Sequence, residues 1–232
     1  MVYMGSKARL AKHLAPIIQS YITPDTVGYL EPFVGGANMI QHIKHEKRYG
    51  SDINKYLIAL LKYSQDLNNI LPETISEEEY RKVKNNKDNY DDWYVGLVGF
   101  CATFGGKYFG GYARDSYDIV AKRIISLAKQ RSSLHSINFK SLPFNDIREL
   151  KNFTIYCDPP YFGTTAYNFK SFNHEIFWDW VRDYSKNNIV LVSEYKAPND
   201  FEVIFEKKVI TKLTKDGTAY KPDVERVFKW KD

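Results

Sequence analysis

The stretch FTIYCDPPY, residues 153–161, does most to decide the fold of this chain. Its first five residues form an apolar run, which is typical of a strand covered on both faces of a parallel sheet. The strand must end at Asp158-Pro159-Pro160-Tyr161, because proline has no N–H to give to a sheet ladder. A carboxylate, a rigid backbone and an aromatic ring therefore follow directly on a buried strand. Ligands of open α/β sheets bind at this kind of edge.

Strands and helices alternate on both sides of this stretch, which indicates a mostly parallel α/β sheet. Apolar runs predict the strands, and apolar residues at helical spacing predict the helices. The expected strands are 27–30, 48–51, 137–139, 153–157, 189–193, 201–205 and 224–230, and the expected helices are 6–21, 37–45, 56–67, 93–102, 118–134 and 174–186.

The alternation is interrupted between residues 61 and 131, which predicts an inserted, largely helical subdomain. The main domain is then formed by residues 1–60 and 132–232. Inside the insert, the segment FGGKYFGGYAR (residues 104–114) interleaves two Gly-Gly pairs with aromatic rings. Glycine supplies the positive φ angles of tight turns, so we expect a hairpin or an exposed loop there.

Charge is concentrated in two parts of the chain, whose net charge is +5 and whose aromatic content is 16%. Residues 207–231 contain eight Lys and Arg against three Asp and Glu, and residues 104–131 contain six against two. Lysine and arginine meet phosphates and aromatic rings stack on bases, so this pattern favours a nucleic-acid partner. A lysine-rich composition around an aromatic core is an equally good reading of the composition alone.

Several classes of protein are excluded or disfavoured by composition. No apolar stretch approaches the length of about 18 residues that a spanning helix needs, and the N-terminal residues lack the apolar block of a signal peptide. The two cysteines cannot form a disulfide framework, and the five histidines show no metal-ligand spacing. We therefore expect a cytoplasmic protein with no membrane association, no metal and no obligate protein partner.

A second acid is expected at the same edge of the sheet as Asp158. The strand at 27–30 runs into a Gly-rich turn, EPFVGG (residues 31–36), and Asp52 follows the next strand about 20 residues later. An acid at this spacing commonly holds ribose hydroxyls. A purely structural turn remains an equally good interpretation of these two features alone.

The Asp-Pro-Pro-Tyr motif fits the recognition of an exocyclic amine. The Asp158 carboxylate and the Pro159 carbonyl are two adjacent acceptors, which match the two hydrogens of an amino group. The Tyr161 ring provides a stacking face for the planar base that carries the amine. The alternative is that the two prolines merely end the strand in a loop and that the acid before them has no function.

The chain resembles the Dam-type DNA adenine-N6 methyltransferases over almost its whole length outside the insert. The resemblance implies an S-adenosylmethionine-dependent enzyme with a seven-stranded Rossmann-like sheet. It also implies transfer of a methyl group to the N6 amine of an adenine flipped out of duplex DNA, in a bacterial or phage-infected cell. The matching pieces are YMGSK (3–7), EPFVGG (31–36), DIN (52–54), YCDPPY (156–161), VLVS (190–193) and ERVF (225–228).

The resemblance also implies roles for individual residues. The catalytic residues would be Asp158, Pro159 and Tyr161. The methyl donor would be bound by Tyr3, Lys7, Pro32, Phe33, Gly35, Asp52 and Asp158, and duplex DNA by Lys107, Tyr112 and Arg114. Alternatively, Arg114 pairs with Asp115 or Asp118 to stiffen its loop. Relatives usually carry an acid after the third strand, whereas residues 141–144 read SLPF. Ser141 or backbone groups would replace that acid, and Phe172 forms either a wall of the base site or ordinary packing.

Other functions remain open at this stage. An N4-cytosine methyltransferase must also bind both hydrogens of an exocyclic amino group. Such enzymes, however, mostly carry serine in place of the first aspartate. Protein-glutamine and RNA methyltransferases more often have asparagine there and lack a basic insert. A DNA-binding module with an inactive site is an alternative from another class, which the intact Asp-Pro-Pro-Tyr motif disfavours.

Overall fold

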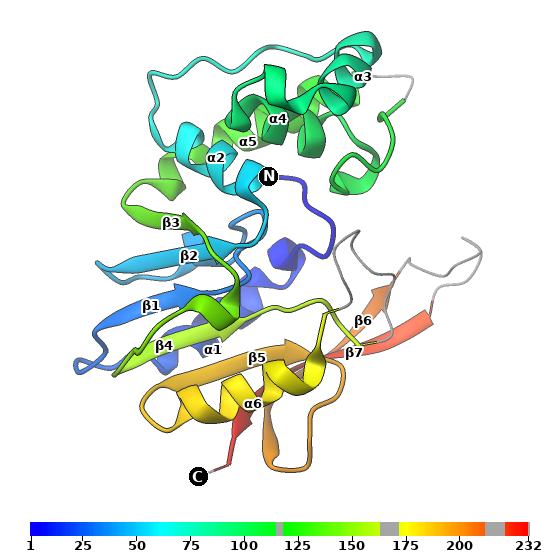
Figure 1. The fold of residues 1–232 in the computed structure, drawn as a ribbon. Helices are drawn as coiled ribbons and strands as arrows, with labels where there is room; N and C mark the ends of the chain where they lie inside the picture. Colours follow the sequence, from blue (N-terminus) through cyan, green and yellow to red (C-terminus); the bar gives the residue numbers. More distant parts are fainter. Residues whose placement is uncertain (115–117, 163–171, 212–220, 232) are drawn as a thin grey trace.

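The computed structural model describes residues 1–114, 118–162, 172–211 and 221–231. Seven strands form one sheet in the order β3-β2-β1-β4-β5-β7-β6 (Figure 1), which confirms the predicted α/β class. The strands are β1 (Gly28–Glu31), β2 (Arg48–Asp52), β3 (Ile137–Ser141), β4 (Phe153–Cys157), β5 (Ile189–Glu194), β6 (Phe201–Thr211) and β7 (Lys221–Trp230).

The helices are α1 (Ala11–Ser20), α2 (Lys55–Gln65), α3 (Glu77–Asn85), α4 (Asp92–Cys101), α5 (Ile119–Leu134) and α6 (His174–Ser185). Short 3₁₀ turns are η1 (Lys7–Arg9), η2 (Ile40–His42), η3 (Lys87–Asn89), η4 (Phe104–Gly106) and η5 (Phe144–Asp146). Asparagine, serine and aspartate side chains cap four of the helices, because their oxygens accept the first free backbone N–H groups. The caps are Asn54, Ser76, Asp118 and Asn173.

The order of the strands creates a switch point in the middle of the sheet. Strands β1 to β5 pair in parallel, whereas β7 is antiparallel to both β5 and β6. From β1 the chain proceeds to β2 and β3 on one side, and β4 and β5 lie on the other. The crevice beyond the carboxyl ends of β1 and β4 is therefore the place where a ligand is expected.

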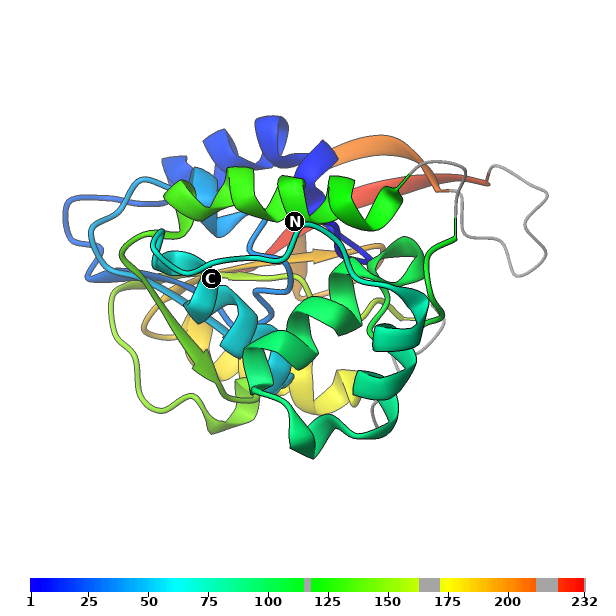
Figure 2. The ribbon, with the colours of Figure 1, turned by 90° about the horizontal axis from the view of Figure 1, so that it is seen from above.

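Alternate residues of the strands build two cores, one on each face of the sheet. Tyr29, Tyr156 and Leu191 belong to the larger core, which also contains residues of α1 and α5. Leu30, Ile155, Cys157 and their neighbours belong to the smaller core under α6. Figure 2 shows α1 and α5 along one side of the sheet and α6 along the other.

The predicted helix over residues 37–45 is wrong, because only the short turn η2 forms there. Ala37 adopts a positive φ of 55°, which a right-handed helix cannot contain. The carbonyls of Gly36 and Ala37 accept hydrogen bonds from the Gln130 side chain of α5 at 3.0 and 3.1 Å. Tertiary contacts thus take up backbone groups that a helix would have used.

The predicted helix over residues 6–21 is divided into η1 and α1 around Leu10. Strands β6 and β7 extend beyond the predicted limits, since each pairs with the other over ten register positions.

Helices α2 and α4 pack closely against each other. A Cβ atom added at Gly96 of α4 would lie 2.1 Å from the Tyr56 carbonyl oxygen of α2. In the Gly-aromatic segment, Thr103 and Tyr112 form an antiparallel bridge, as expected for a hairpin. None of the helices within the described ranges combines the length and the apolar character of a membrane span.

Candidate functional site

An ion pair joins the N-terminal turn to the Asp-Pro-Pro-Tyr motif at the switch point. Ser6 accepts a hydrogen bond from the Ala8 N–H at 3.2 Å and so begins η1 with Lys7 as its first residue. The Lys7 Nζ atom lies 2.7 Å from Asp158 Oδ1, directly after the last residue of β4. Two residues far apart in the sequence are thereby brought together, and only the family resemblance predicted that both belong to the site.

Glu225 of β7 is a further member of this site, and the sequence analysis gave it no role. Its Oε1 atom lies 3.8 Å from Lys7 Nζ, and it accepts a hydrogen bond from the Tyr161 hydroxyl. The Lys7 ammonium also lies over the Tyr161 ring, 4.5 Å from its centroid. An acid between the apolar positions of a strand, inside one of the family-like motifs, was the signal that could have identified it.

Several carboxyl groups at this edge of the sheet have raised pKa values. Burial raises the pKa of Asp158 and of Glu225, and the Lys7 ammonium opposes both shifts. Burial also raises the pKa of Glu31, at the end of β1, to about 8, while the hydrogen bond from Tyr29 at 2.7 Å opposes this shift. Such shifted carboxyl groups at one strand edge are typical of a functional site.

Glu194, the last residue of β5, fixes the start of the segment after Tyr161. Its two oxygens accept hydrogen bonds from the Phe162 N–H at 3.0 Å and the Tyr195 N–H at 2.7 Å. The Tyr195 ring meets the edge of the Tyr161 ring at a centroid distance of 4.7 Å. Burial raises the pKa of Glu194 to about 7. The orientation of the Tyr161 ring is thus set from β5 as well as from β7.

Asp52, Gly35 and Tyr3 lie together on the β1–β2 side of the crevice. The Asp52 carboxylate accepts hydrogen bonds from the Asn54 N–H at 2.9 Å and the Gly35 N–H at 3.3 Å. Burial nevertheless raises its pKa to about 6. Gly35 has a φ of 48°, and a Cβ atom there would lie 2.8 Å from the Tyr3 ring. Only glycine therefore allows the turn to approach Tyr3 this closely.

Phe33 belongs to an aromatic cluster on the α6 side of the sheet. Its ring lies 5.4 Å from Phe144, 5.8 Å from Phe172 and 5.7 Å from Phe177, measured between centroids. Phe144 stands in the turn after β3, where the sequence lacks the expected acid. Phe172 packs against three other phenyl rings, and this agrees with the packing alternative for that residue.

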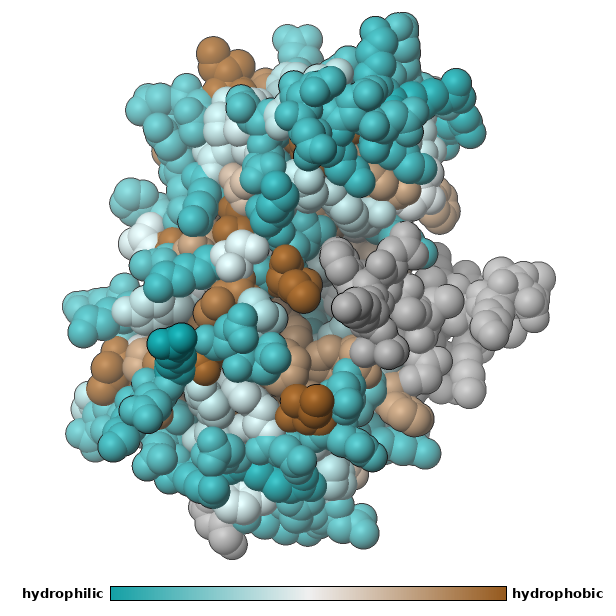
Figure 3. Space-filling view, in the orientation of Figure 1, coloured by the Kyte–Doolittle hydropathy of each residue, from teal (hydrophilic) through white to brown (hydrophobic). Residues whose placement is uncertain are grey.

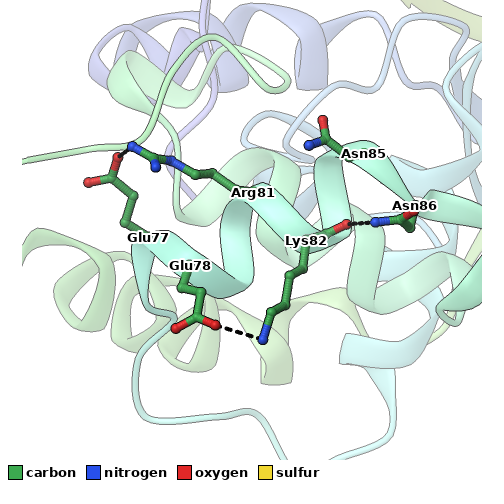
Figure 4. A pocket seen from close by; sticks show the side chains of 6 residues that line it. All are labelled: Glu77, Glu78, Arg81, Lys82, Asn85 and Asn86. Atoms are coloured by element: carbon green, nitrogen blue, oxygen red, sulfur yellow. Dashed lines mark hydrogen bonds and ion pairs between the residues drawn. The ribbon is translucent and has the colours of Figure 1, made fainter.

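The three residues predicted to contact DNA lie on the insert. The Tyr112 hydroxyl donates a hydrogen bond to the Ile75 carbonyl at 2.8 Å. Arg114 is exposed and forms a two-pronged ion pair with Glu77, the first residue of α3, rather than with Asp118. Asp115, the other expected partner, lies outside the described residues. The same Glu77 carboxylate binds Arg81 at 2.5 Å (Figure 4). The surface over α3 and α4 is mainly hydrophilic (Figure 3).

The arrangement offers hydrogen-bond acceptors and an aromatic face. Within the described ranges, no three His, Cys, Asp or Glu side chains are grouped to hold a metal ion. Asp158, Pro159 and Tyr161 follow β4 at the switch point, with Asp52 at the end of β2, two strands away. The geometry suits a planar amine on one side of the crevice and hydroxyl groups on the other.

Comparison with known proteins identifies a family for the N-terminal part of the chain. The model of the D12 class N6 adenine-specific DNA methyltransferases matches residues 3–97, which is less than half of the chain. The match confirms the resemblance inferred from the motifs, and with it the expected class of enzyme. No curated protein matches the chain.

Two solved structures are similar to the chain at low identity. A putative methyltransferase from Thermoplasma acidophilum has 9% identity and a TM-score of 0.34, with 89% of this chain and 69% of that chain covered. A second putative methyltransferase, complexed with SAH, has 11% identity and a TM-score of 0.39, with 97% and 52% covered. This chain thus spans about half the length of the second protein. The fold assignment rests on the observed strand order.

Proposed function

We propose that this chain, whose residues 3–97 match the D12 class N6 adenine-specific DNA methyltransferases, methylates the N6 amine of adenine in duplex DNA. The methyl donor is S-adenosylmethionine, and the target base is flipped out of the helix. The observation that carries the proposal is the position of Asp158-Pro159-Pro160-Tyr161. The motif lies beyond β4, beside the point where the strand order reverses.

The chemistry of the amine explains why two acceptors are needed. The adenine N6 lone pair is delocalised into the ring, which makes the amine a poor nucleophile. When Asp158 and the Pro159 carbonyl accept its two hydrogens, the nitrogen becomes more tetrahedral and its lone pair can attack the methyl carbon. The N–C bond forms as the S–C bond breaks, and S-adenosylhomocysteine leaves with the S–C bonding electrons on sulfur. The methylated nitrogen then releases one proton to solvent. The Asp158 carboxylate offsets the positive charge that develops on nitrogen, an effect worth roughly 3–4 kcal/mol for one such contact.

The residues around Asp52 fit the donor. S-adenosylmethionine supplies the reactive sulfonium methyl group when it is bound. Asp52 is half-buried and has two backbone N–H partners, so it is held rigidly and still has oxygen lone pairs for ribose hydroxyls. Tyr3, Pro32, Phe33 and Gly35 would line the same side, with Lys7 between this side and Asp158. Holding nitrogen, methyl and sulfur in line supplies the remaining acceleration.

Flipping a base out of duplex DNA costs a few kcal/mol. Stacking on the Tyr161 ring offsets part of this cost, because the hydroxyl of that ring is fixed by Glu225 and its edge meets Tyr195. Lys107 and Arg114 of the insert would contact the duplex, with lysine on phosphate and arginine on a base edge.

The test is direct incubation of the protein with tritiated S-adenosylmethionine and duplex DNA. We expect label in the DNA, and digestion to nucleosides should give N6-methyladenine. Label in N4-methylcytosine would replace the proposal by cytosine methylation. Absence of label in DNA, with donor binding retained in calorimetry, would contradict the proposed reaction and favour the inactive DNA-binding alternative.

A further inference from the structure

Glu225 is a buried acid that the proposed methyl transfer does not use. Only 4% of its surface is exposed, although carboxylates are seldom buried without a partner. It lies on β7, in register with Lys207 of β6, and its Oε1 atom faces the Lys7 ammonium across 3.8 Å. The Lys7 ammonium and the Tyr161 hydroxyl, which both contact it, belong to the site around Asp158.

The ion pair of Lys7 competes with the chemistry assigned to Asp158. The ammonium lies 2.7 Å from Asp158 Oδ1 and draws on the negative charge that the target amine would use. Lys7 is itself 9% exposed, and leaving a buried ammonium without a partner is strongly unfavourable. The competition for the Asp158 carboxylate is smallest if Lys7 has a second acceptor nearby when the amine binds.

Glu225 has the position that such an acceptor requires. The Lys7 ammonium needs to move by about 1 Å to shorten 3.8 Å to the length of a charge-assisted hydrogen bond. A lysine side chain has a flexible stem of four carbons, and rotation about its bonds can make this shift without backbone movement. We propose that Glu225 is a positioning residue that receives the Lys7 ammonium when the target amine engages Asp158. This inference rests on the proposed function.

Tyr161 connects this movement to the arrival of the base. Its hydroxyl donates to Glu225, and its ring lies under the Lys7 ammonium at 4.5 Å. A base that stacks on the Tyr161 ring therefore contacts the residue that already touches both Lys7 and Glu225. The ammonium also moves away from the nitrogen on which positive charge develops, which lowers the repulsion in the transition state.

Glu225→Gln removes the negative charge of this residue and keeps the size of its side chain. Glutamine keeps an oxygen that accepts the Tyr161 hydroxyl, but it cannot neutralise the ammonium. We expect single-turnover methylation at saturating donor and DNA to slow by about tenfold or more, with unchanged donor affinity. Glu225→Asp, which keeps the charge, should recover part of the rate. Glu206→Gln is the matched control, because Glu206 binds Arg226 on the same pair of strands and is 58% exposed.

A double-mutant cycle with Lys7→Met separates the proposal from a purely structural role. Without the ammonium there is no cation to receive, so adding Glu225→Gln to Lys7→Met should change the rate by less than about twofold. An equal loss in both backgrounds would overturn the proposal and leave Glu225 as a support for Tyr161. A rate for Glu225→Gln equal to that of the wild type would overturn it as well.

A spectroscopic readout does not depend on turnover. The ¹⁵N resonance of Lys7 Nζ, assigned by its loss in Lys7→Met, should move when S-adenosylhomocysteine and adenine-containing duplex DNA are added together. It should stay in place in Glu225→Gln. A resonance that does not move in the wild type overturns the proposal, whereas an inactive wild type in which the resonance moves contradicts only the proposed reaction.

Discussion

Arg114 and Glu77 form a two-pronged ion pair that joins the Gly-aromatic segment to the first turn of α3. Glu77 follows the cap residue Ser76, so its carboxylate is also favoured by the dipole at the helix N-terminus. The guanidinium edge used by Glu77 is the edge that would read a guanine. Glu77 therefore holds Arg114 in the protein without DNA, and Arg81 remains to bind Glu77 when Arg114 leaves.

Arg114→Ala should relax the target sequence at one base pair, because a bidentate arginine contact discriminates that base. Methylation of a randomised DNA pool, followed by sequencing of the modified sites, measures this directly. Arg81→Ala is the matched control, since it removes the other partner of Glu77 and keeps Arg114. An unchanged motif with a uniformly lower rate in Arg114→Ala would assign this arginine to backbone binding or to structure.

Asp158→Ala should abolish methyl transfer while the chain remains folded, because Asp158 lies beyond the end of β4 rather than in either core. Lys7 keeps Glu225 as a partner in this variant, which limits the loss of stability. Tritium transfer and thermal unfolding are measured on the same preparation. Turnover comparable to the wild type, with an unchanged melting temperature, would refute the mechanism.

Asp52 should make donor binding depend on pH. The ionised carboxylate accepts ribose hydroxyls, and its pKa of about 6 means that it takes up a proton as the pH falls through 6. Donor affinity should therefore decrease below pH 6 in the wild type. Asp52→Asn should bind the donor more weakly, by on the order of 1–3 kcal/mol, and lose this pH dependence. Calorimetry between pH 5 and pH 8 decides, and wild-type affinity in Asp52→Asn would place the ribose elsewhere.

Glu31→Gln should stabilise the protein at alkaline pH. The Glu31 pKa rises from 4.5 to about 8 on folding, so the folded state retains a proton that the unfolded state releases. The wild type thus loses stability as the pH rises from 4.5 to 8, by on the order of a few kcal/mol. Denaturant unfolding should show a small difference between Glu31→Gln and the wild type at pH 4.5 and a large one at pH 9. A difference independent of pH would contradict the assignment.

Gly96→Ala should separate α2 from α4. A Cβ atom at Gly96 would overlap the Tyr56 carbonyl oxygen, which belongs to the backbone and cannot rotate away. Overpacking of this kind costs about 1–3 kcal/mol, and urea unfolding measures it. Alanine at Gly105 is a control, because a Cβ atom there meets nothing within 4 Å and only its positive φ opposes the change.

The sequence by itself determined the strands that bear the site. The run FTIYC could only be a buried strand, and the prolines after Asp158 could only end it, since both effects are local. The capping residues Asn54 and Asp118 likewise begin their helices through hydrogen bonds to the next few residues. Parallel strands with a common carboxyl edge then predicted that Asp52 and Asp158 lie at the same side of the sheet.

The tertiary structure alone decided which side chains meet. The segment 37–45 has a helical pattern, but Gln130 of α5, more than ninety positions away, binds its carbonyls and replaces the helix. Glu225 meets Lys7 and Tyr161 only because β7 inserts antiparallel between β5 and β6. Arg114 binds Glu77, which lies 37 positions away in the sequence. The spacing of apolar residues along the chain predicts helices and strands. The partners named here depend instead on the order of the strands and on helix packing, which no local pattern specifies.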